Sequence, residues 1–332
     1  MSGGNAVTPT STSAQARVML YQPSQRPRLR EGDWTDTSFG RCRVTGRLGQ
    51  RHADIVEAVL YCAERRRPVS DGGVELLVDP ARVRKTLSDS RYSFTQIEKL
   101  LAKLRAATIT IETPQFDFPI IGGLIDHVIP SPMTRPDPLT GGERNLWRVR
   151  LGVALVMLLE HDLSLYYDPA PIACLRHGIS QAVARHVLSH KVEPTGGWYL
   201  DTVIVAVAGQ ASGQAMRDAR RRLKEETQEL REIGLALDGD RIKTEDDIAA
   251  YLDAVMEDGD PALIAAALGD VARARNLSQL ARDVGMSRQG LDKALSGDGN
   301  PSLATVVKVA QALGLRLAFK PTYGGPTPAA GA

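Results

Sequence analysis

The chain has 332 residues, of which 43% are hydrophobic and 24% are charged, and its net charge is +2. This is the composition of an ordinary folded protein with room for two or three domains, and the net charge alone says nothing about nucleic acid. The three cysteines, Cys42, Cys62 and Cys174, lack a CxxC spacing, which argues against a disulfide scaffold or zinc ribbon and indicates reduced thiols. No signal peptide is visible and no apolar run approaches the ~20 residues of a membrane span, so we expect a soluble, cytoplasmic protein that does not bind membranes.

Residues 1–37 predict a disordered basic arm. This segment has too little apolar surface to fold alone, because Ser, Thr, Gly and Pro dominate it. Its basic character comes from Arg17, Arg26, Arg28 and Arg30. Two roles remain open, namely added contacts to phosphates or a tail that only improves solubility.

Residues 38–130 predict a winged helix. The pattern indicates a strand at about 38–45, a helix at 50–65 and a second strand at 74–78. A short helix at 81–87, a longer helix at 93–107 and a β-hairpin at 108–129 follow. Ser93 and Gln96 form an S-x-x-Q capping box at the start of the longer helix. This helix is expected to enter the major groove of DNA. Its candidate contact residues are Arg91, Thr95, Gln96, Lys99 and Lys103.

Residues 131–145 contain several prolines and a Thr-Gly-Gly, and they predict a linker. Residues 146–243 predict a second winged helix that ends in a long basic helix at 213–233, capped by Ser212, and a hairpin at 235–243 with an Asp-Gly turn. Helices are also expected at 171–191 and 199–208. The candidate DNA contacts of this second unit are Gln214, Arg217, Arg220, Arg221 and Lys224, with Arg241 in the wing.

Several cations on one face of a helix favour neutralisation of DNA phosphates, because their mutual repulsion costs stability when no partner is bound. The alternative is that the acidic residues that follow them pair with them at helical spacing. These are Glu225, Glu226, Glu229 and Glu232. We favour DNA binding, since the basic residues come first, at the end of the helix that would face the groove.

Residues 244–320 predict an all-α helix-turn-helix domain of repressor type. Ser278 can cap a short helix at 279–284, Gly285 tolerates the positive φ of a tight turn, and Ser287 can cap a second helix at 288–295. In the major groove, guanidinium groups pair with guanine and side-chain amides with adenine. The candidate DNA contacts are Ser278, Gln279, Ser287, Arg288, Gln289 and Lys293. The alternative is a small packing unit with a polar surface.

The same segment resembles the addiction-module antidote family, the Xre-type antitoxins of toxin–antitoxin operons. The resemblance covers about 247–317 and is carried by GDPALI, the ALGD and ARAR runs, SQLAR and KALSGDGNPS. It implies a small helix bundle that binds its own operator and a RelE-superfamily toxin. Asn276 and Asp292 stand where glycine and tyrosine are expected in the family, so the operator sequence cannot be carried over.

In architecture alone, residues 38–243 resemble plasmid replication initiators, which contain two winged helices in tandem. That resemblance implies binding to repeats in a plasmid origin, with dimers that repress and monomers that initiate, and it implies host replication proteins as partners. Residues 321–332 predict a disordered tail.

His186 and His190 are four residues apart on an expected helix, and His177 precedes them. Neither an HExxH motif nor a nearby Cys or carboxylate accompanies them, so we expect no metal site. The chain also lacks GxGxxG, GxxxxGK[ST] and a nucleophile elbow. We therefore expect no cofactor and no enzymatic activity.

Together these patterns predict an α+β fold that is mainly α with small β-hairpins: two tandem winged helices followed by a repressor-type helix-turn-helix domain. The expected function is sequence-specific binding of double-stranded DNA by a homodimer, at the nucleoid or a plasmid, as a replication initiator-like protein. The alternatives are a transcriptional repressor without initiation activity and an antitoxin that neutralises a RelE-like toxin.

Overall fold

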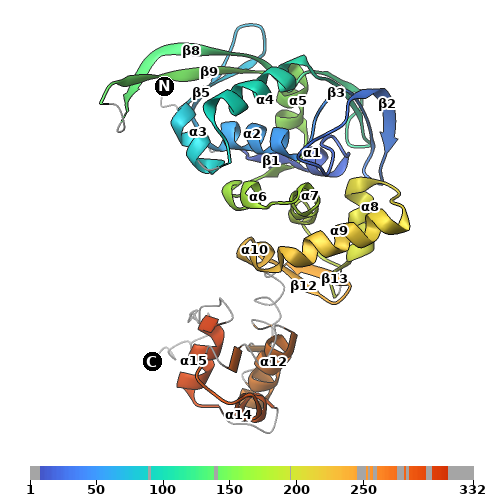
Figure 1. Cartoon of the computed structure of the whole chain (residues 1–332), viewed down its shortest axis with the longest axis vertical. Helices are drawn as coiled ribbons and strands as arrows, with labels where there is room; N and C mark the ends of the chain where they lie inside the picture. Colours follow the sequence, from blue (N-terminus) through green and yellow to red (C-terminus); the bar gives the residue numbers. More distant parts are fainter. Residues whose placement is uncertain are drawn as a thin grey trace, which may run out of the picture. The chain divides into compact units, whose positions relative to one another are not determined.

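The computed structural model describes residues 8–88, 91–137, 141–194, 196–244, 252, 255–256, 260–274, 280–281, 284–296 and 301–312. The fold is α+β, and in these residues helices accompany four small antiparallel sheets (Figure 1). The chain divides into two compact units, unit 1 at 1–244 and unit 2 at 245–332. None of the described helices is both long and apolar enough to cross a membrane.

Unit 1 contains two lobes, and each lobe has its own cluster of buried apolar side chains. We call residues 8–161 the first lobe and residues 164–244 the second lobe. The helices of the first lobe are α1 (Ser13–Arg17), α2 (Gln50–Tyr61), α3 (Pro80–Thr86), α4 (Phe94–Ala106) and α5 (Val153–His161). Its strands are β1 (Ser11–Thr12), β2 (Arg30–Asp36), β3 (Arg41–Gly46), β4 (Ala63–Pro68), β5 (Val74–Val78), β6 (Thr108–Glu112), β7 (Ile120–Gly122), β8 (Ile125–Pro136) and β9 (Glu143–Leu151).

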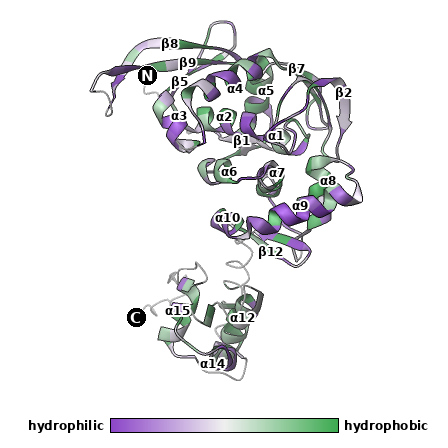
Figure 2. Cartoon of the chain, viewed as in Figure 1, coloured by the Kyte–Doolittle hydropathy of each residue, from purple (hydrophilic) through white to green (hydrophobic). Residues whose placement is uncertain are grey.

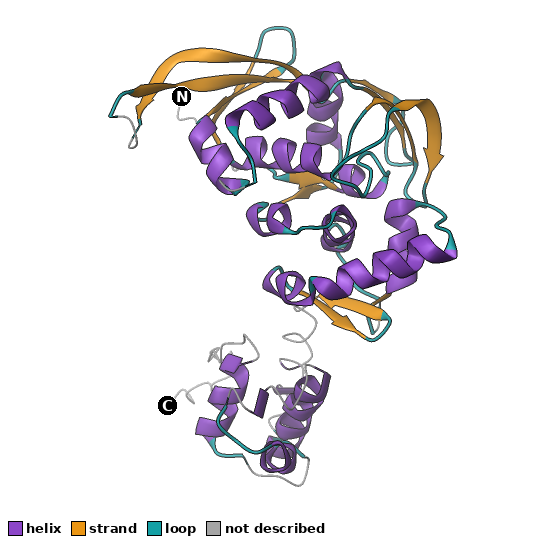
Figure 3. Cartoon of the chain, viewed as in Figure 1, coloured by secondary structure: helices purple, strands orange, loops and turns teal. Residues whose placement is uncertain are grey.

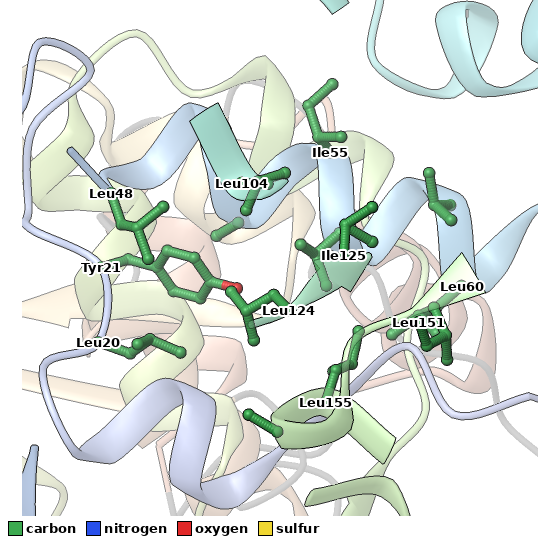
Figure 4. Close-up of a cluster of buried hydrophobic side chains, with 14 of the residues drawn as sticks. Leu20, Tyr21, Leu48, Ile55, Leu60, Leu104, Leu124, Ile125, Leu151 and Leu155 are labelled. Carbon is green, nitrogen blue, oxygen red and sulfur yellow. The ribbon is translucent and has the colours of Figure 1, made fainter. Parts of the chain in front are cut away.

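Two four-stranded sheets and the helices beside them build the first lobe. Their strand orders are β2-β3-β6-β7 and β4-β5-β9-β8. Helix α2 packs against α4, and the apolar side chains of both helices meet those of the sheets in one core (Figure 4). Ile55, Leu104 and Ile125 are among its fully or almost fully buried members. The helix predicted at about 50–65 is therefore present, although it ends at Tyr61 and β4 follows it.

Local capping signals place the two middle helices of the first lobe as predicted. Asp79 accepts a hydrogen bond from the Ala81 amide at 2.9 Å, and Pro80 occupies the first turn of α3. At α4, the Ser93 hydroxyl accepts from the Gln96 amide at 3.2 Å, and the Gln96 side chain accepts from the Ser93 amide at 2.9 Å. This is the predicted capping box, which satisfies two amides that the helix itself cannot pair.

The predicted disordered arm at 1–37 is wrong for its described part, residues 8–37. Strand β1 pairs with β10 of the second lobe, α1 follows it, and β2 pairs with β3. Val18, Leu20 and Tyr21 are buried in the core of the first lobe. For β1 the prediction failed because its partner strand lies more than a hundred residues away, where a local composition argument does not reach. Residues 1–7 lie outside the described residues.

The predicted linker at 131–145 is also wrong. The described residues of that range belong mostly to β8 and β9, which pair in register from Thr134↔Asn145 to Pro136↔Glu143. Figure 3 shows this hairpin as a long ribbon that extends beyond the helices of the first lobe. Prolines at 130, 132 and 136 are tolerated because β8 is an edge strand of its sheet, where one row of amides needs no partner.

The second lobe has a three-stranded sheet with the order β11-β13-β12. Its elements are β10 (Ser164–Leu165), α6 (Ala170–Cys174), α7 (Gly178–Leu188), β11 (Trp198–Tyr199), α8 (Leu200–Ala208), α9 (Gly213–Glu225), α10 (Thr227–Glu232), β12 (Leu235–Asp238) and β13 (Arg241–Thr244). Strands β12 and β13 form the predicted hairpin around Gly239, with Asp238 opposite Arg241.

The long helix predicted at 213–233 is divided at Glu226 into α9 and α10. The Glu226 side chain is fully buried and accepts hydrogen bonds from the backbone amides of Arg176 and His177. These amides precede α7, so the carboxylate ties the break in the helix to the start of another helix. Glu226 is therefore not a partner for the basic run on α9, although Arg176 lies within ion-pair distance of it.

Unit 2 contains α12 (Pro261–Ala274), α14 (Arg288–Ala294) and α15 (Leu303–Ala312). Leu268, Leu291 and Val309, one from each helix, share an apolar cluster. Gly285 has a φ of +73°, so it supplies the left-handed turn predicted before α14. Ser287 then caps α14, because its hydroxyl accepts from the Gly290 amide at 3.0 Å.

We expect Gly178→Ala to lower the free energy of unfolding of unit 1 by about 1–3 kcal/mol. Gly178 begins α7, where an added Cβ would lie 2.7 Å from the Cα atom of Ser24 and 2.8 Å from its carbonyl carbon. These are backbone atoms, which cannot rotate aside. Urea denaturation measures the loss. Gly123→Ala is the control, because its nearest neighbour would be at 3.6 Å, and equal costs for both variants would contradict the argument.

Candidate nucleic-acid interface

Helix α4 exposes most of the polar side chains that the sequence predicted to face DNA. Thr95, Gln96, Lys99 and Lys103 are exposed on it, while the apolar face is buried in the core. Gln96 also closes the capping box, which holds its side chain at the start of the helix. The exposed face can therefore offer one side-chain amide and two ammonium groups to a ligand.

Arg91 does not belong to this face. Its Nη1 donates to the backbone carbonyl of Leu175 at 2.9 Å and, more weakly, to that of Ala173 at 3.4 Å. The side chain thus bridges the first lobe to the carbonyl end of α6 in the second lobe. We correct its predicted role from a DNA contact to a structural contact between the lobes.

Helix α9 presents a strongly polar surface, coloured mostly purple in Figure 2. Only Ala219 and Leu223 of this helix are buried. Ser212 caps it as predicted, with its hydroxyl accepting from the Ala215 amide at 3.3 Å. The five predicted contact residues, Gln214, Arg217, Arg220, Arg221 and Lys224, are all exposed.

Ion pairs divide the basic residues of α9 into two groups. Arg220 donates through two nitrogens to the Asp201 carboxylate on α8, and this hydrogen bonding holds the pKa of Asp201 below its usual value. Arg221 donates to Glu225 one turn later. The pairing with a following acidic residue that the sequence left open is thus present for Arg221, whereas Arg220 pairs with an acidic residue of another helix.

Arg217 and Lys224 form the second group. Arg217 donates to the Gln214 side-chain oxygen at 2.8 Å. No carboxylate of the described residues lies within ion-pair distance of either Arg217 or Lys224. Because seven residues are close to two helical turns, both side chains lie on one face of α9. These two cations are the ones that α9 can offer to an anionic partner without first breaking an ion pair.

Arg241, predicted as a contact in the wing, is held by its own lobe. Its guanidinium carbon lies 3.6 Å from the centre of the Tyr199 ring, and its Nη1 donates to the Gly197 carbonyl at 3.0 Å. A stacked guanidinium of this kind is fixed in direction, because the ring attracts the cation over its face. Arg241 therefore stiffens the edge of the β11-β13-β12 sheet.

In unit 2, α14 exposes Arg288, Gln289 and Lys293 while Leu291 is buried. The capping hydroxyl of Ser287 is engaged by the Gly290 amide, so Ser287 serves the helix first. Ser278 and Gln279, predicted to lie before the turn, fall outside the described residues. An exposed helix start with a guanidinium and an amide is the arrangement that reads bases in the major groove.

The C-terminal part of the chain is similar to known proteins. Residues 237–321 match a family model described as "Probable addiction module antidote protein". Over 90 residues the chain is also 49% identical to an uncharacterised protein of Haemophilus influenzae, and the match covers 90% of that protein and 27% of this chain. Through this region the chain belongs to the addiction-module antidote family.

The antidote resemblance predicted from the sequence is thus confirmed, with a wider extent than the predicted 247–317. The antidote region begins within β12 of unit 1 and includes α12, α14 and α15. The resemblance of residues 38–243 to replication initiators stays a prediction. No solved structure matches the chain.

The histidines that could have suggested a metal site form a packed pair outside the antidote region. The rings of His186 and His190 on or next to α7 are 4.8 Å apart, edge to face. Burial, with a smaller contribution from His190, lowers the pKa of His186 to about 4, so its ring is neutral near pH 7. Within the described ranges, no group of three or more His, Cys, Asp or Glu residues could hold a metal ion.

A buried polar cluster that the sequence patterns did not reveal joins α2 of the first lobe to α7 of the second. Arg185 on α7 donates to Glu57 from Nε at 2.8 Å, to Gln50 from Nη1 at 2.7 Å and to Asp54 from Nη2 at 2.6 Å. The acceptors lie at positions i, i+4 and i+7 of α2, a polar stripe at helical spacing that was the one local signal of this cluster. Burial alone would lower the pKa of Arg185, but the charges of Glu57 and Asp54 raise it well above its usual value.

Proposed function

We propose that this chain is a non-enzymatic protein that binds double-stranded DNA in a sequence-specific manner. Three parts of the chain would bind DNA, namely the two lobes of unit 1, acting as winged helices, and the antidote region. The proposal rests on one observation about unit 1. Both lobes contain a helix, a strand, two helices and a closing hairpin in the same order, and in both the second of the two helices, α4 or α9, exposes a polar face.

In the first lobe α2, β5, α3, α4, β8 and β9 follow one another in this order, with β4 inserted before β5 and with β6 and β7 inserted before β8. Three strands of its four-stranded sheet are arranged as β5-β9-β8. In the second lobe α7, β11, α8, α9, β12 and β13 follow one another in this order, with α10 inserted before β12, and the strands are arranged as β11-β13-β12. In each case the last strand lies between the other two. This order of helices and strands is typical of winged helices, in which the third helix enters the major groove.

The exposed residues of these helices suit two different tasks. Cations bind phosphates at any sequence and fix the position of the protein, whereas paired hydrogen bonds to base edges distinguish sequences. Lys99, Lys103, Arg217 and Lys224 serve the first task. Gln96, Gln214, Arg288 and Gln289 serve the second.

The DNA target is an origin or operator in the cytoplasm, and the chain acts there as a replication initiator that also represses its own gene, together with host replication proteins. One short helix gives little discrimination, so a homodimer on repeated sites supplies the rest. A plasmid-maintenance assay separates initiation from repression alone. If a plasmid bearing the candidate origin replicates without this gene, the chain acts as a repressor.

Selection from random duplexes, followed by footprinting of the selected sequence at low ionic strength, tests DNA binding itself. The expected result is one enriched sequence motif and a protected segment longer than a single helix can cover. Absence of any protected duplex would refute the proposed function.

We expect Arg288→Ala to remove about 1–3 kcal/mol of discrimination at one base pair of the selected site, because a guanidinium that pairs with guanine reads that position alone. Lys293→Ala on the same helix is the matched control. It should weaken binding to all duplexes alike, about tenfold at 0.1 M salt for one phosphate contact. Binding of single-base variants of the site measures both effects, and equal behaviour of the two variants would contradict the assignment.

A second function, neutralisation of a toxin, is favoured by the family match of residues 237–321. We propose that the antidote region binds a RelE-like toxin. Co-purification with the product of an adjacent small basic reading frame, and rescue of growth when both are expressed, test it. Absence of both a complex and rescue would remove this function.

A further inference from the structure

The two lobes of unit 1 are joined mainly by polar contacts. Apart from Ala173 of α6, the apolar cluster of the first lobe contains only residues that precede the second lobe, and the cluster of the second lobe contains residues from 172 onward. Between these clusters lies the set of hydrogen-bonded side chains around Arg185. We call this set the junction cluster, and it consists of Gln50, Asp54, Glu57, Tyr92, Tyr167, Gln181 and Arg185.

The junction cluster is closed to solvent and almost fully paired. The side chains of Arg185, Asp54 and Glu57 are 4%, 0% and 2% exposed. Asp54 also accepts from the Tyr92 hydroxyl at 2.5 Å, and Glu57 accepts from the Tyr167 hydroxyl at 2.7 Å. Four of the guanidinium hydrogen bonds cross from α7 to α2.

These four hydrogen bonds of the Arg185 guanidinium allow little rotation between the lobes. Hydrogen bonds weaken steeply away from their preferred angle, and a buried charge that loses its partner cannot be hydrated in place. An apolar contact of the same size would allow the two surfaces to slide, because hydrophobic burial has no direction. The junction cluster therefore defines a single orientation of α7 relative to α2.

Helices α2 and α7 have similar places in the two lobes, because α2 precedes β5, α7 precedes β11, and each of these strands pairs with the last strand of its lobe. Fixing one against the other therefore fixes α4 relative to α9 as well. We infer that Arg185 is a positioning residue that sets the spacing and angle between the two DNA-reading helices, so that unit 1 accepts two DNA segments only at one separation. This inference rests on the proposed function.

Other polar contacts also cross the junction, including the backbone pairing of β1 with β10 and two arginine side chains. Arg91 reaches the carbonyl of Leu175, and Arg17 donates from Nε to the Ser189 hydroxyl at 2.9 Å. The side chains of Arg91 and Arg17 are partly exposed, in contrast to that of Arg185. These contacts support the orientation of the lobes, but the four hydrogen bonds of the Arg185 guanidinium determine it.

The first test measures the junction without DNA. The neutral variant Asp54→Asn with Glu57→Gln and Arg185→Met keeps the side-chain volumes and removes all three charges, so it leaves no buried charge unpaired. Spin labels at Ala102→Cys on α4 and Gln228→Cys on α10, in a Cys174→Ser background, report the distance between the lobes. We expect its distribution to become at least twofold broader in the neutral variant. An unchanged width with an unchanged circular dichroism spectrum would overturn the inference.

Two controls separate loosened orientation from partial unfolding. The pair Glu75→Gln with Arg148→Met removes an ion pair that lies within the first lobe and should leave the distribution unchanged. Labels at Ala102→Cys and Arg82→Cys, both in the first lobe, should keep their narrow distribution in the neutral variant. If those labels broaden too, the cluster only holds the first lobe together and the inference is wrong.

The second test uses the duplex selected by the unaltered protein. Inserting about five base pairs, half a helical turn, between the segments protected by the two lobes should weaken binding of the unaltered protein more than tenfold. The neutral variant should lose less than threefold. If the unaltered protein binds no duplex, the proposed function fails while the spin-label result still decides the role of Arg185. If it binds and both proteins lose affinity equally, the inference fails alone.

Discussion

Replacing Arg217 and Lys224 together by alanine is expected to weaken DNA binding on every duplex by about a hundredfold at 0.1 M salt. Each phosphate contact that a cation makes contributes about 0.9 to the slope of log affinity against log salt, which corresponds to about tenfold per contact at that concentration. The slope should therefore fall by about two. Titrations of a labelled duplex between about 0.05 and 0.2 M salt measure both quantities.

These two residues are chosen because, unlike Arg220 and Arg221, they have no carboxylate partner among the residues that the structure describes. A cation that is engaged in an ion pair must first break that pair before it can bind a phosphate. Its net contribution to the free energy of DNA binding is therefore smaller. Arg220→Ala with Asp201→Ala is the matched control, because it removes an ion pair on the same surface and leaves the net charge unchanged. A loss of slope in the control equal to that in the test variant would show that the division of α9 into paired and unpaired cations is wrong.

The elements that the sequence predicted correctly are those whose signals lie within a few residues of one another. The capping box at Ser93 and Gln96, the cap of Ser212, and the turn at Gly285 followed by the cap of Ser287 are all present. A capping side chain accepts hydrogen bonds from backbone amides two or three positions further along the chain. The residues that form a cap are therefore close in sequence as well as in space.

Two of the three mispredicted features depend on partners far along the chain, and the third depends on the strand that follows it. Strand β1 exists because it pairs with β10, and β8 passes through the proline-rich stretch because β9 returns beside it. The break between α9 and α10 has the same origin, since the buried Glu226 carboxylate serves amides about fifty residues away. Composition and periodicity describe a segment by itself, so none of these three features was accessible to them.

The candidate interface shows the same division. The outward direction of the polar residues on α4, α9 and α14 follows from helical periodicity and is confirmed. What each residue does there was not predictable, because Arg91, Arg220 and Arg241 find partners in other elements. Sequence could therefore identify the exposed faces, while the structure was needed to separate free cations from those already engaged.

The largest loss of stability is expected from Arg185→Met alone, which should lower the free energy of unfolding of unit 1 by about 3–5 kcal/mol. The substitution leaves Asp54 and Glu57 buried with no cation nearby, and the cost comes from these unpaired charges more than from lost packing. Urea denaturation followed by tryptophan fluorescence measures it. The signal reports unit 1 alone, since Trp34, Trp147 and Trp198 all lie there.

The neutral variant distinguishes this cause from a simple packing defect. It contains the same Arg185→Met substitution, but Asn and Gln replace the two carboxylates, so most of the lost stability should return even though two further residues are changed. Replacing a buried ion pair by well-packed hydrophobic residues of similar volume is often neutral, and Asn and Gln with Met likewise leave no charge buried. If the triple variant were less stable than the single one, the junction would depend on the shape of the guanidinium more than on its charge. In that case the orientation of the lobes would be set by packing, and the broadening expected from the spin labels would have a different origin.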